Sequence, residues 1–291
     1  MGKIRNETIF DRPGQTCNRL WSWLDSAGKA IANGTRLRII FWDRETRHFS
    51  NLRESSNVSF PFYSPFMEEH FRWYREIVFW FFGTRAIKWI FRHLGEERGF
   101  VEGWKRRDSH EWFPQVKEEI TELFRPDKEI TEEVEEAFGK RRENGFLIIG
   151  VHIRRGDYKE WEGGKYYLDN ADYAERMREV GRLFPDHRIC FFISSNEPVR
   201  KSDFEGLDLM ETGFTTPVHD LYGLSLCDRI IGPLSTFSRW ASFYGRVPLC
   251  FIGKDTPIDS DEDFSPIEHF YRFENGKEIP NLTDKRKEDC R

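Results

Sequence analysis

Residues 146–158 read FLIIGVHIRRGDY. The first eight residues are mostly apolar and β-branched, which predicts a strand buried on both faces, as in a parallel sheet. The polar residues Arg154, Arg155 and Asp157 follow at once, so they stand at the carboxyl end of that strand. Because open α/β sheets bind ligands at this edge, the stretch indicates both a fold class and the position of a site.

Strands and helices alternate through the rest of the C-terminal half. The spacing of apolar residues predicts helices over 171–184, 218–227 and 237–244, and strands over 188–194, 207–211, 229–232 and 247–252. This order is typical of a parallel sheet with helices on both faces.

The N-terminal half begins in the same way and then becomes helical. We expect a strand over 7–10, a helix over 18–33 and a buried strand over 36–43. Residues 66–138 have a helical pattern, and five tryptophans fall within it at 73, 80, 89, 104 and 112. These rings either form an aromatic helical core or present a surface for sugars or a membrane interface.

The domain boundary is expected near Asn144 and Gly145, where a charged helix gives way to the apolar run. The fold class we predict is α/β, with two Rossmann-like domains covering residues 1–144 and 145–291, the first of which carries the helical insertion.

The composition argues against a nucleic-acid-binding, an exported or a membrane-spanning protein. The 50 acidic and 45 basic residues leave no bulk positive charge, so we expect no nucleic-acid partner. The cysteines are few and scattered, which is typical of reduced thiols in a cytoplasmic protein; they are Cys17, Cys190, Cys227, Cys250 and Cys290. No secretory signal is evident, and no window approaches the roughly 18 apolar residues of a membrane span.

Two neighbouring arginines at a strand end can clamp a phosphate, because guanidinium groups donate paired hydrogen bonds to its oxygens. Asp157 could hold one guanidinium or accept a proton from a substrate hydroxyl. The alternative is a surface turn with a local ion pair. An adhesive Arg155-Gly156-Asp157 tripeptide is disfavoured, since it would need an exported protein.

Three more polar clusters stand at predicted strand ends. Gly14 to Asn18 permits a tight turn before a helix, Ser194 to Asn196 follows a strand, and Ser235, Thr236 and Ser238 precede a helix. Each alone also reads as a helix cap or a turn. Together they predict a nucleotide-dependent enzyme, and the absence of GxxxxGK[ST] and GxGxxG argues against P-loop and dinucleotide folds.

These motifs have a family resemblance. GVHIRRGDY, FFISSNEP and VHDLYGLSLCDRIIGPLSTFSRWASFYG, preceded by GQTCNRL, resemble the bacterial α-1,2-fucosyltransferases and, more loosely, the α-1,2/α-1,6/protein O-fucosyltransferase superfamily. The resemblance implies a GT-B fold of two facing Rossmann-like domains. It also implies that GDP-fucose lies in the C-terminal domain, that no metal or other cofactor is needed, and that the acceptor is a glycan or a lipid-linked glycan.

The resemblance further implies individual roles. His152 would lie near the guanine and ribose, and Arg154 on the β-phosphate, with Arg155 and Asp157 in the same motif. The remaining donor-binding residues would be Ser194 and Asn196 at the nucleoside, Ser235, Thr236, Phe237 and Ser238 around the diphosphate, and Asn18 and Arg19 in the N-terminal loop. Relatives usually have Gly-Asn-Gln where this chain has Cys17-Asn18-Arg19, and often tryptophan at Arg239, so the acceptor and linkage stay open.

The reaction we expect is an inverting, metal-independent transfer in which Arg154 stabilises the departing diphosphate. Asp157 is either the base or a residue that orients an arginine. The alternatives are a metal-dependent glycosyltransferase that uses Asp259 and Asp261, and a non-catalytic carbohydrate-binding protein. Residues 75–94 mix aromatic and basic side chains, so they either pack in the core or make a peripheral membrane contact.

Overall fold

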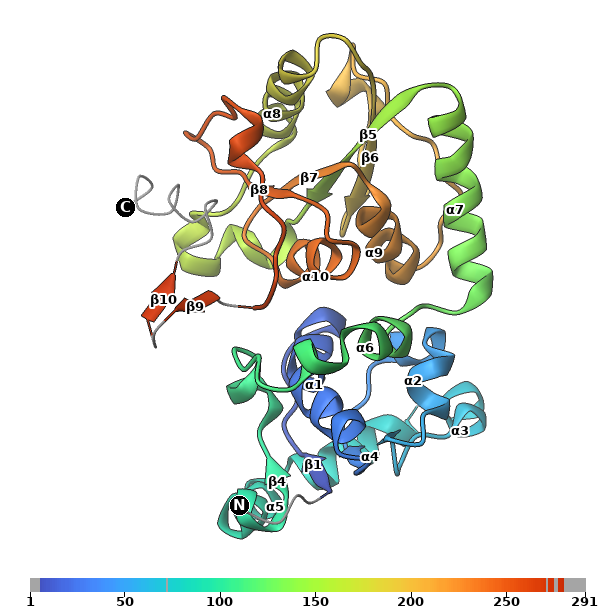
Figure 1. Cartoon of the computed structure of the whole chain (residues 1–291), viewed down its shortest axis with the longest axis vertical. Coiled ribbons are helices and arrows are strands. Elements are labelled where there is room, and N and C mark those ends of the chain that lie inside the picture. Colours follow the sequence, from blue (N-terminus) through green and yellow to red (C-terminus); the bar gives the residue numbers. More distant parts are fainter. Residues whose placement is uncertain (1–5, 72, 271, 275–276, 280–291) are drawn as a thin grey trace. The chain divides into compact units, whose positions relative to one another are not determined.

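The computed structural model describes residues 6–71, 73–270, 272–274 and 277–279, and it divides into two compact units, Met1–Asp127 and Lys128–Arg291 (Figure 1). Each unit is built on a four-stranded parallel sheet, with strand orders β3-β2-β1-β4 and β6-β5-β7-β8. The α/β class predicted from the alternating pattern is therefore confirmed.

The C-terminal unit places β5 at the centre of its sheet. Its strands are β5 (Phe146–Ile153), β6 (Arg188–Ser195), β7 (Arg229–Gly232) and β8 (Leu249–Phe251), with a separate antiparallel pair β9 (Arg272–Glu274) and β10 (Lys277–Ile279). Its helices are α7 (Lys128–Glu143), α8 (Asn170–Leu183), α9 (Pro217–Leu226) and α10 (Thr236–Gly245). The predicted strand over 207–211 shrinks to a single bridge between Phe191 and Leu209, because this segment only touches the outer edge of β6.

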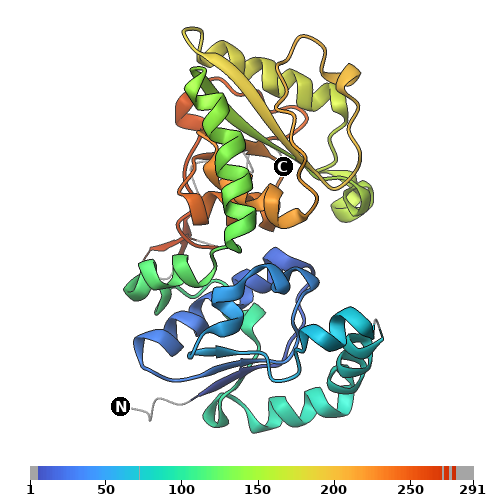
Figure 2. The same ribbon diagram turned by 90° about the vertical axis from the view of Figure 1, so that its right-hand side faces the viewer.

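Side chains of the central strand alternate between two helical layers. Ile149 and Val151 join the core cluster of Tyr173 and Met177 on α8. On the opposite face, a Cβ on Gly150 would lie 2.7 Å from Leu224, so α9 can approach this closely only at a glycine. Figure 2 shows α7 and α8 on opposite sides of the sheet.

The helix α7 belongs to the C-terminal unit, so the units divide between Asp127 and Lys128 rather than at the predicted 144/145. The change in composition at Asn144 marks the end of this charged helix and not the end of a domain. Its apolar stripe is buried, and Phe138 packs on Phe192 of β6 with ring centroids 5.2 Å apart. On the same helix, Glu135 accepts a 2.6 Å hydrogen bond from Tyr222 of α9.

The sheet of the N-terminal unit has four strands where the sequence predicts two, and each observed strand is short. Its strands are β1 (Glu7–Ile9), β2 (Leu37–Ile39), β3 (Val58–Ser59) and β4 (Phe100–Val101), and its helices are α1 (Thr16–Ala32), α2 (Ser50–Glu54), α3 (Pro65–His70), α4 (Tyr74–Gly83), α5 (Arg85–Leu94) and α6 (Lys117–Leu123). Residues 66–138 are thus not all helical, since β4 pairs with β1. Two residues are too few to show a strand period.

The tryptophans of the helical stretch do not form a core. Trp73, Trp80 and Trp89 are 56%, 73% and 64% exposed, and only Phe79 of α4 is buried. The core interpretation of this segment is therefore wrong for these three side chains.

Two sequence expectations concern the whole chain. Within the described ranges, no helix has the length and apolar character needed to cross a bilayer. Cys17, Cys190, Cys227 and Cys250 are free and buried, and Cys290 lies outside the described residues.

Candidate functional site

The carboxyl ends of β5, β6 and β7 bring together most of the predicted site residues of the C-terminal unit. His152 on β5 lies opposite Ser194 on β6 in the sheet register. The imidazole is buried and stacks on Phe237 at the start of α10, with ring centroids 5.0 Å apart. β7 passes His152 closely, because a Cβ on Gly232 would lie only 3.0 Å from that of His152.

The buried imidazole of His152 has an unused hydrogen-bonding atom. Among the residues that the structure describes, nothing hydrogen-bonds its Nδ1. Burial, together with the charge of Arg154, lowers the pKa of His152 to about 3, so the ring is neutral at pH 7. An unsatisfied buried nitrogen is costly, so Nδ1 of His152 is available to a hydrogen-bonding partner, either a ligand or a water.

Arg154 is held in place with most of its donors available. Its Nη2 lies 2.7 Å from Oδ1 of Asp157, and its Cζ lies 5.4 Å from the ring centroid of Tyr158. In the described part of the chain, the other guanidinium N–H groups have no acceptor. Gly156, at φ +68°, makes the turn that returns Asp157 to Arg154. The geometry is that of an aspartate orienting an arginine.

Arg155 differs from its neighbour, because its guanidinium is tied to two groups inside the unit. Its Nε donates to the carbonyl of Leu168 at 3.3 Å, and its Nη2 hydrogen-bonds Asn170. Asn196 accepts from the backbone N–H of Arg155 at 2.8 Å and donates to its carbonyl at 3.3 Å. Arg155 and Asn196, both predicted to bind the donor, make the contacts of residues that position the loop.

Ser194 leads to a residue that sequence reasoning missed. Its hydroxyl donates to Oδ2 of Asp220 at 3.1 Å. Asp220 lies in the first turn of α9, and burial raises its pKa to about 6, partly offset by this hydrogen bond. In the sequence, an acid in the first turn of a helix is explained by its favourable interaction with the helix dipole. Only the packing of α9 on β6 brings its carboxylate to Ser194 and hence to the end of β5.

The start of α10 is tied to the same place. Ser235 caps the helix by accepting from the N–H of Phe237 at 3.2 Å, and the buried hydroxyl of Ser238 donates to the carbonyl of Ser235 at 3.3 Å. Tyr158 donates to the carbonyl of Leu234 at 2.6 Å, which fastens the Arg154 loop to this helix start. Ser235 and Ser238 are thus structural here, whereas half-buried Thr236 lies at the positive end of the helix dipole.

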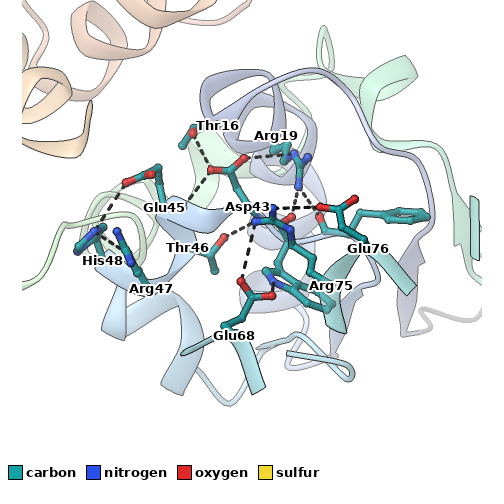
Figure 3. A network of polar contacts seen from close by, with 12 residues as sticks. Thr16, Arg19, Asp43, Glu45, Thr46, Arg47, His48, Glu68, Arg75 and Glu76 are labelled. Atoms are coloured by element: carbon teal, nitrogen blue, oxygen red, sulfur yellow. Dashed lines mark hydrogen bonds and ion pairs between the residues drawn. The ribbon is translucent and has the colours of Figure 1, made fainter. Parts of the chain in front are cut away.

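Arg19, predicted to bind the donor, is buried in the N-terminal unit (Figure 3). Its guanidinium donates to the carbonyls of Gly14 and Trp42 and lies 3.7 Å from Asp43. Burial lowers its pKa to about 10, although Asp43 opposes the shift. These contacts join the loops after β1 and β2, so Arg19 is a structural residue of this unit.

Asn18 is half-buried beside that loop. Gly14 has φ +25°, and a Cβ there would lie 2.0 Å from Nδ2 of Asn18. The glycine therefore lets the amide of Asn18 lie directly over the turn.

One of the two acids of the metal-dependent alternative is already engaged. Asp261 accepts two 2.8 Å hydrogen bonds from the guanidinium of Arg229, which lower the pKa of its carboxyl group. Asp259 stands at the start of a turn in which Asp263 accepts from its N–H at 2.9 Å. Counting described residues alone, no three His, Cys, Asp or Glu side chains group as a metal site would require.

Comparison with known sequences finds a glycosyltransferase family model and fucosyltransferase relatives. The family model of glycosyl transferase family 11 matches residues 65–262. Galactoside alpha-(1,2)-fucosyltransferase 1 of Plecturocebus brunneus is 25% identical over 166 residues, which cover 52% of this chain and 44% of that protein. The Homo sapiens protein of the same name is 23% identical over 166 residues, with the same coverage. The matched part is thus less than half the length of these relatives.

Similar solved structures support the fold. Fucosyltransferase NodZ from Bradyrhizobium has a TM-score of 0.53 at 17% identity, covering 86% of this chain and 96% of that one. NodZ co-crystallised with GDP has the same TM-score at 19% identity, covering 89% and 99%. A mutant of Arabidopsis thaliana FUT1 in complex with GDP has a TM-score of 0.55 at 12% identity, covering 97% and 79%. At these identities the likeness shows a shared fold of the GT-B kind.

Proposed function

This chain belongs to glycosyl transferase family 11, and we propose that it transfers fucose from GDP-fucose to a hydroxyl group of a glycan, in an α-1,2 linkage. The observation that carries the proposal is the strand-end cluster in which neutral, unsatisfied His152 stands beside Arg154, whose donors are available. The names of the matched relatives, which are fucosyltransferases, support the same donor and reaction.

We assign the recognition of guanine to Asp220 and His152. Guanine presents an N1–H and an amino group side by side, and a carboxylate can accept both, as it does from other paired donors. Asp220 already accepts from Ser194 through one oxygen, which leaves acceptor capacity for the base. A nucleotide base that has no such pair of donors would leave this buried carboxylate unsatisfied.

The diphosphate would bind Arg154 and the start of α10, near Thr236. In the proposed inverting step, the acceptor oxygen attacks the anomeric carbon of fucose and gives up its proton to water, while the bond from that carbon to the β-phosphate oxygen breaks. GDP leaves with the electron pair, and Arg154 stabilises the charge that grows on it. Asp157 keeps the guanidinium aimed. No metal ion has a role in this scheme.

The test is binding and turnover in EDTA. We expect GDP and GDP-fucose to raise the melting temperature, and UDP and ADP to leave it nearly unchanged, because bound ligand stabilises by mass action. Fucose should then pass to a galactoside acceptor. Equal stabilisation by all nucleotides, or turnover only after a metal is restored, would overturn the proposal. GDP binding without any turnover would favour the non-catalytic alternative.

We further propose that the protein is cytoplasmic and rests on an anionic membrane surface, where a lipid-linked acceptor would be found. The free, buried cysteines favour a reducing compartment. Trp73, Ile77, Trp80 and Phe81 recur at the spacing of one helical face along α4 and its N-cap, and all are exposed. Tryptophan on an exposed helix face beside basic residues is typical of interfacial helices.

The membrane contact is tested by flotation with vesicles. Wild-type protein should float with vesicles that contain phosphatidylglycerol, and a Trp73→Ser, Phe81→Ser variant should float much less. If the variant and the wild type float equally, α4 is not the contact.

A further inference from the structure

A pocket of about 320 Å³ opens in the N-terminal unit, and none of its lining residues was predicted to bind the donor, although Arg12 lies two residues before the GQTCNRL loop. It is lined by Arg12 and Lys88, by the aromatic residues Phe41, Phe79 and Trp80, and by the turn Gly83–Thr84. Arg12 and Phe41 follow β1 and β2, whereas the others come from α4 and α5 and the turn between them. The walls are therefore aromatic, and the charges are cationic.

The two cations of the pocket have no acidic partner. For the residues with described positions, no carboxylate lies within ion-pair distance of Arg12 or Lys88. The guanidinium of Arg12 instead lies 4.6 Å from the ring centroid of Phe79.

The other arginines around this pocket are already paired with acids. The guanidinium groups of Arg19 and Arg75 both lie 5.8 Å from the same Phe79 ring, and each already faces its own acids. The pocket thus keeps two uncompensated cations on a surface where nearby arginines are neutralised. Thr84 also caps α5, so the positive end of a ten-residue helix lies at the pocket wall.

The geometry points to a phosphate as the ligand. An arginine fork, a lysine and a helix start can together contact several oxygens of one phosphate, which carries more charge than a carboxylate. We propose that the pocket of Arg12, Lys88 and Thr84 binds a phosphate group, with the exposed ring of Trp80 covering the sugar or glycerol to which it is attached. None of the lining residues of this pocket is among those assigned to the donor, and the proposal does not rest on the fucosyltransferase assignment.

Two sources carry the same chemistry. A soluble sugar phosphate could fill the pocket, and so could the phosphodiester of a lipid headgroup. The second source fits the exposed aromatic face of α4, since Trp80 belongs both to that face and to the pocket.

The experiment compares a double variant with a charge-matched control. Arg12→Gln with Lys88→Gln removes both cations, and Arg36→Gln with Lys117→Gln removes two exposed cations elsewhere in the same unit. Glucose 1-phosphate and glucose are titrated calorimetrically with GDP at saturation, so that the donor site is occupied. Vesicles of phosphatidylcholine, with and without phosphatidylglycerol, form the second arm.

We expect the wild type and the control to bind either glucose 1-phosphate or the phosphatidylglycerol vesicles, and to ignore glucose. The double variant should bind at least about tenfold more weakly, because each lost partner is a charge-assisted hydrogen-bond donor. Binding should also weaken as salt is added. The arm that responds identifies the source.

The proposal is overturned if neither probe binds the wild type. It is also overturned if the double variant binds as tightly as the control does to whichever probe the wild type binds. The stabilisation by GDP is measured on every variant. Its persistence shows that the C-terminal unit is folded, and an unchanged circular dichroism spectrum of each variant shows that the N-terminal unit is folded as well. Absence of GDP stabilisation in the wild type would count against the donor site alone.

Discussion

The carboxyl edges of the two parallel sheets look alike in sequence and differ in what their polar groups contact. Each edge has an arginine near the strand ends: Arg154 directly follows β5, and Arg19 lies in the first turn of α1, where it contacts the loops after β1 and β2. Arg19 is buried, and its guanidinium donates hydrogen bonds to the carbonyls of Gly14 and Trp42. Arg154 donates one hydrogen bond to Asp157, and its other guanidinium N–H groups are available to a ligand. An arginine at a strand end marks a binding site only when the fold leaves its donors unused.

The largest expected effect concerns Arg154. Arg154→Ala should lower kcat by roughly 10²–10³, the usual effect of removing one donor to a developing charge. The melting temperature should change little, because among the described residues the guanidinium contacts only the exposed Asp157 and the ring of Tyr158. Turnover is measured at saturating GDP-fucose, with Arg154→Lys as the control that keeps the charge. Near-normal kcat in the alanine variant would contradict the role assigned here.

Arg19 should respond in the opposite way. Arg19→Met leaves buried carbonyls and Asp43 without their partner, so the free energy of unfolding should fall by about 3 kcal/mol. The affinity for GDP should change by less than about threefold once the variant is folded at low temperature. Chemical denaturation and calorimetry measure the two quantities. A stable variant with lost GDP affinity would reverse the comparison.

The third prediction concerns Asp220 at the C-terminal edge and the pH dependence of GDP affinity. Asp220→Asn should weaken GDP binding about tenfold, since the amide offers an acceptor to one of the two guanine donors and places its own NH2 donor against the other. In the wild type, the affinity for GDP should fall as the pH drops through about 6, where Asp220 becomes protonated.

The contribution of Asp220 to folding stability has the opposite pH dependence to its contribution to GDP affinity. Because the folded-state pKa of Asp220 is raised from 3.8 to about 6, the folded protein holds this proton more tightly than the unfolded chain does. Its contribution to stability is therefore lost as the pH rises from about 4 to 6. The ligand-free Asn variant should gain stability relative to the wild type over that range, measured by thermal unfolding. Equal pH profiles for the two proteins would show that Asp220 is not the titrating group.

The smallest effect is expected at Gly14. Gly14→Ala should lower stability by about 1 kcal/mol through its positive φ, and should also displace the amide of Asn18. Gly34→Ala is the matched control, since Gly34 has φ +61° and open space around it. Only the Gly14 variant should lose turnover, by a fewfold. An equal loss in both would mean that Asn18 has no part in the reaction.

The sequence predicted the elements that have a clear period and missed those that do not. The eight apolar residues Phe146–Ile153 form β5 with the expected bounds. Phe100–Val101 was hidden among helices, because two residues carry no alternation. The boundary at Asn144 was set by composition, whereas the apolar stripe of α7 packs on the C-terminal sheet.

The site was predicted as a set of residues, and the tertiary structure separates them by function. His152 and Arg154 have hydrogen-bonding groups without a partner among the described residues. Asn196 instead hydrogen-bonds the backbone of Arg155. Arg19 is buried in the other unit. No local pattern distinguishes these residues, since the partners of Arg155 stand 13 to 41 positions away. Asp220 was missed for the same reason, because Ser194 is 26 positions from it.

What the sequence determined by itself is the alternation of apolar runs and the motifs at their ends, because hydrophobic periodicity and turn chemistry are local properties. The tertiary structure alone decided which of those polar groups remain available, and that the tryptophans of α4 and α5 face outward. Both outcomes depend on which distant carbonyl, carboxylate or ring occupies the neighbouring space, and the register of the sheets and the packing of the helices set that.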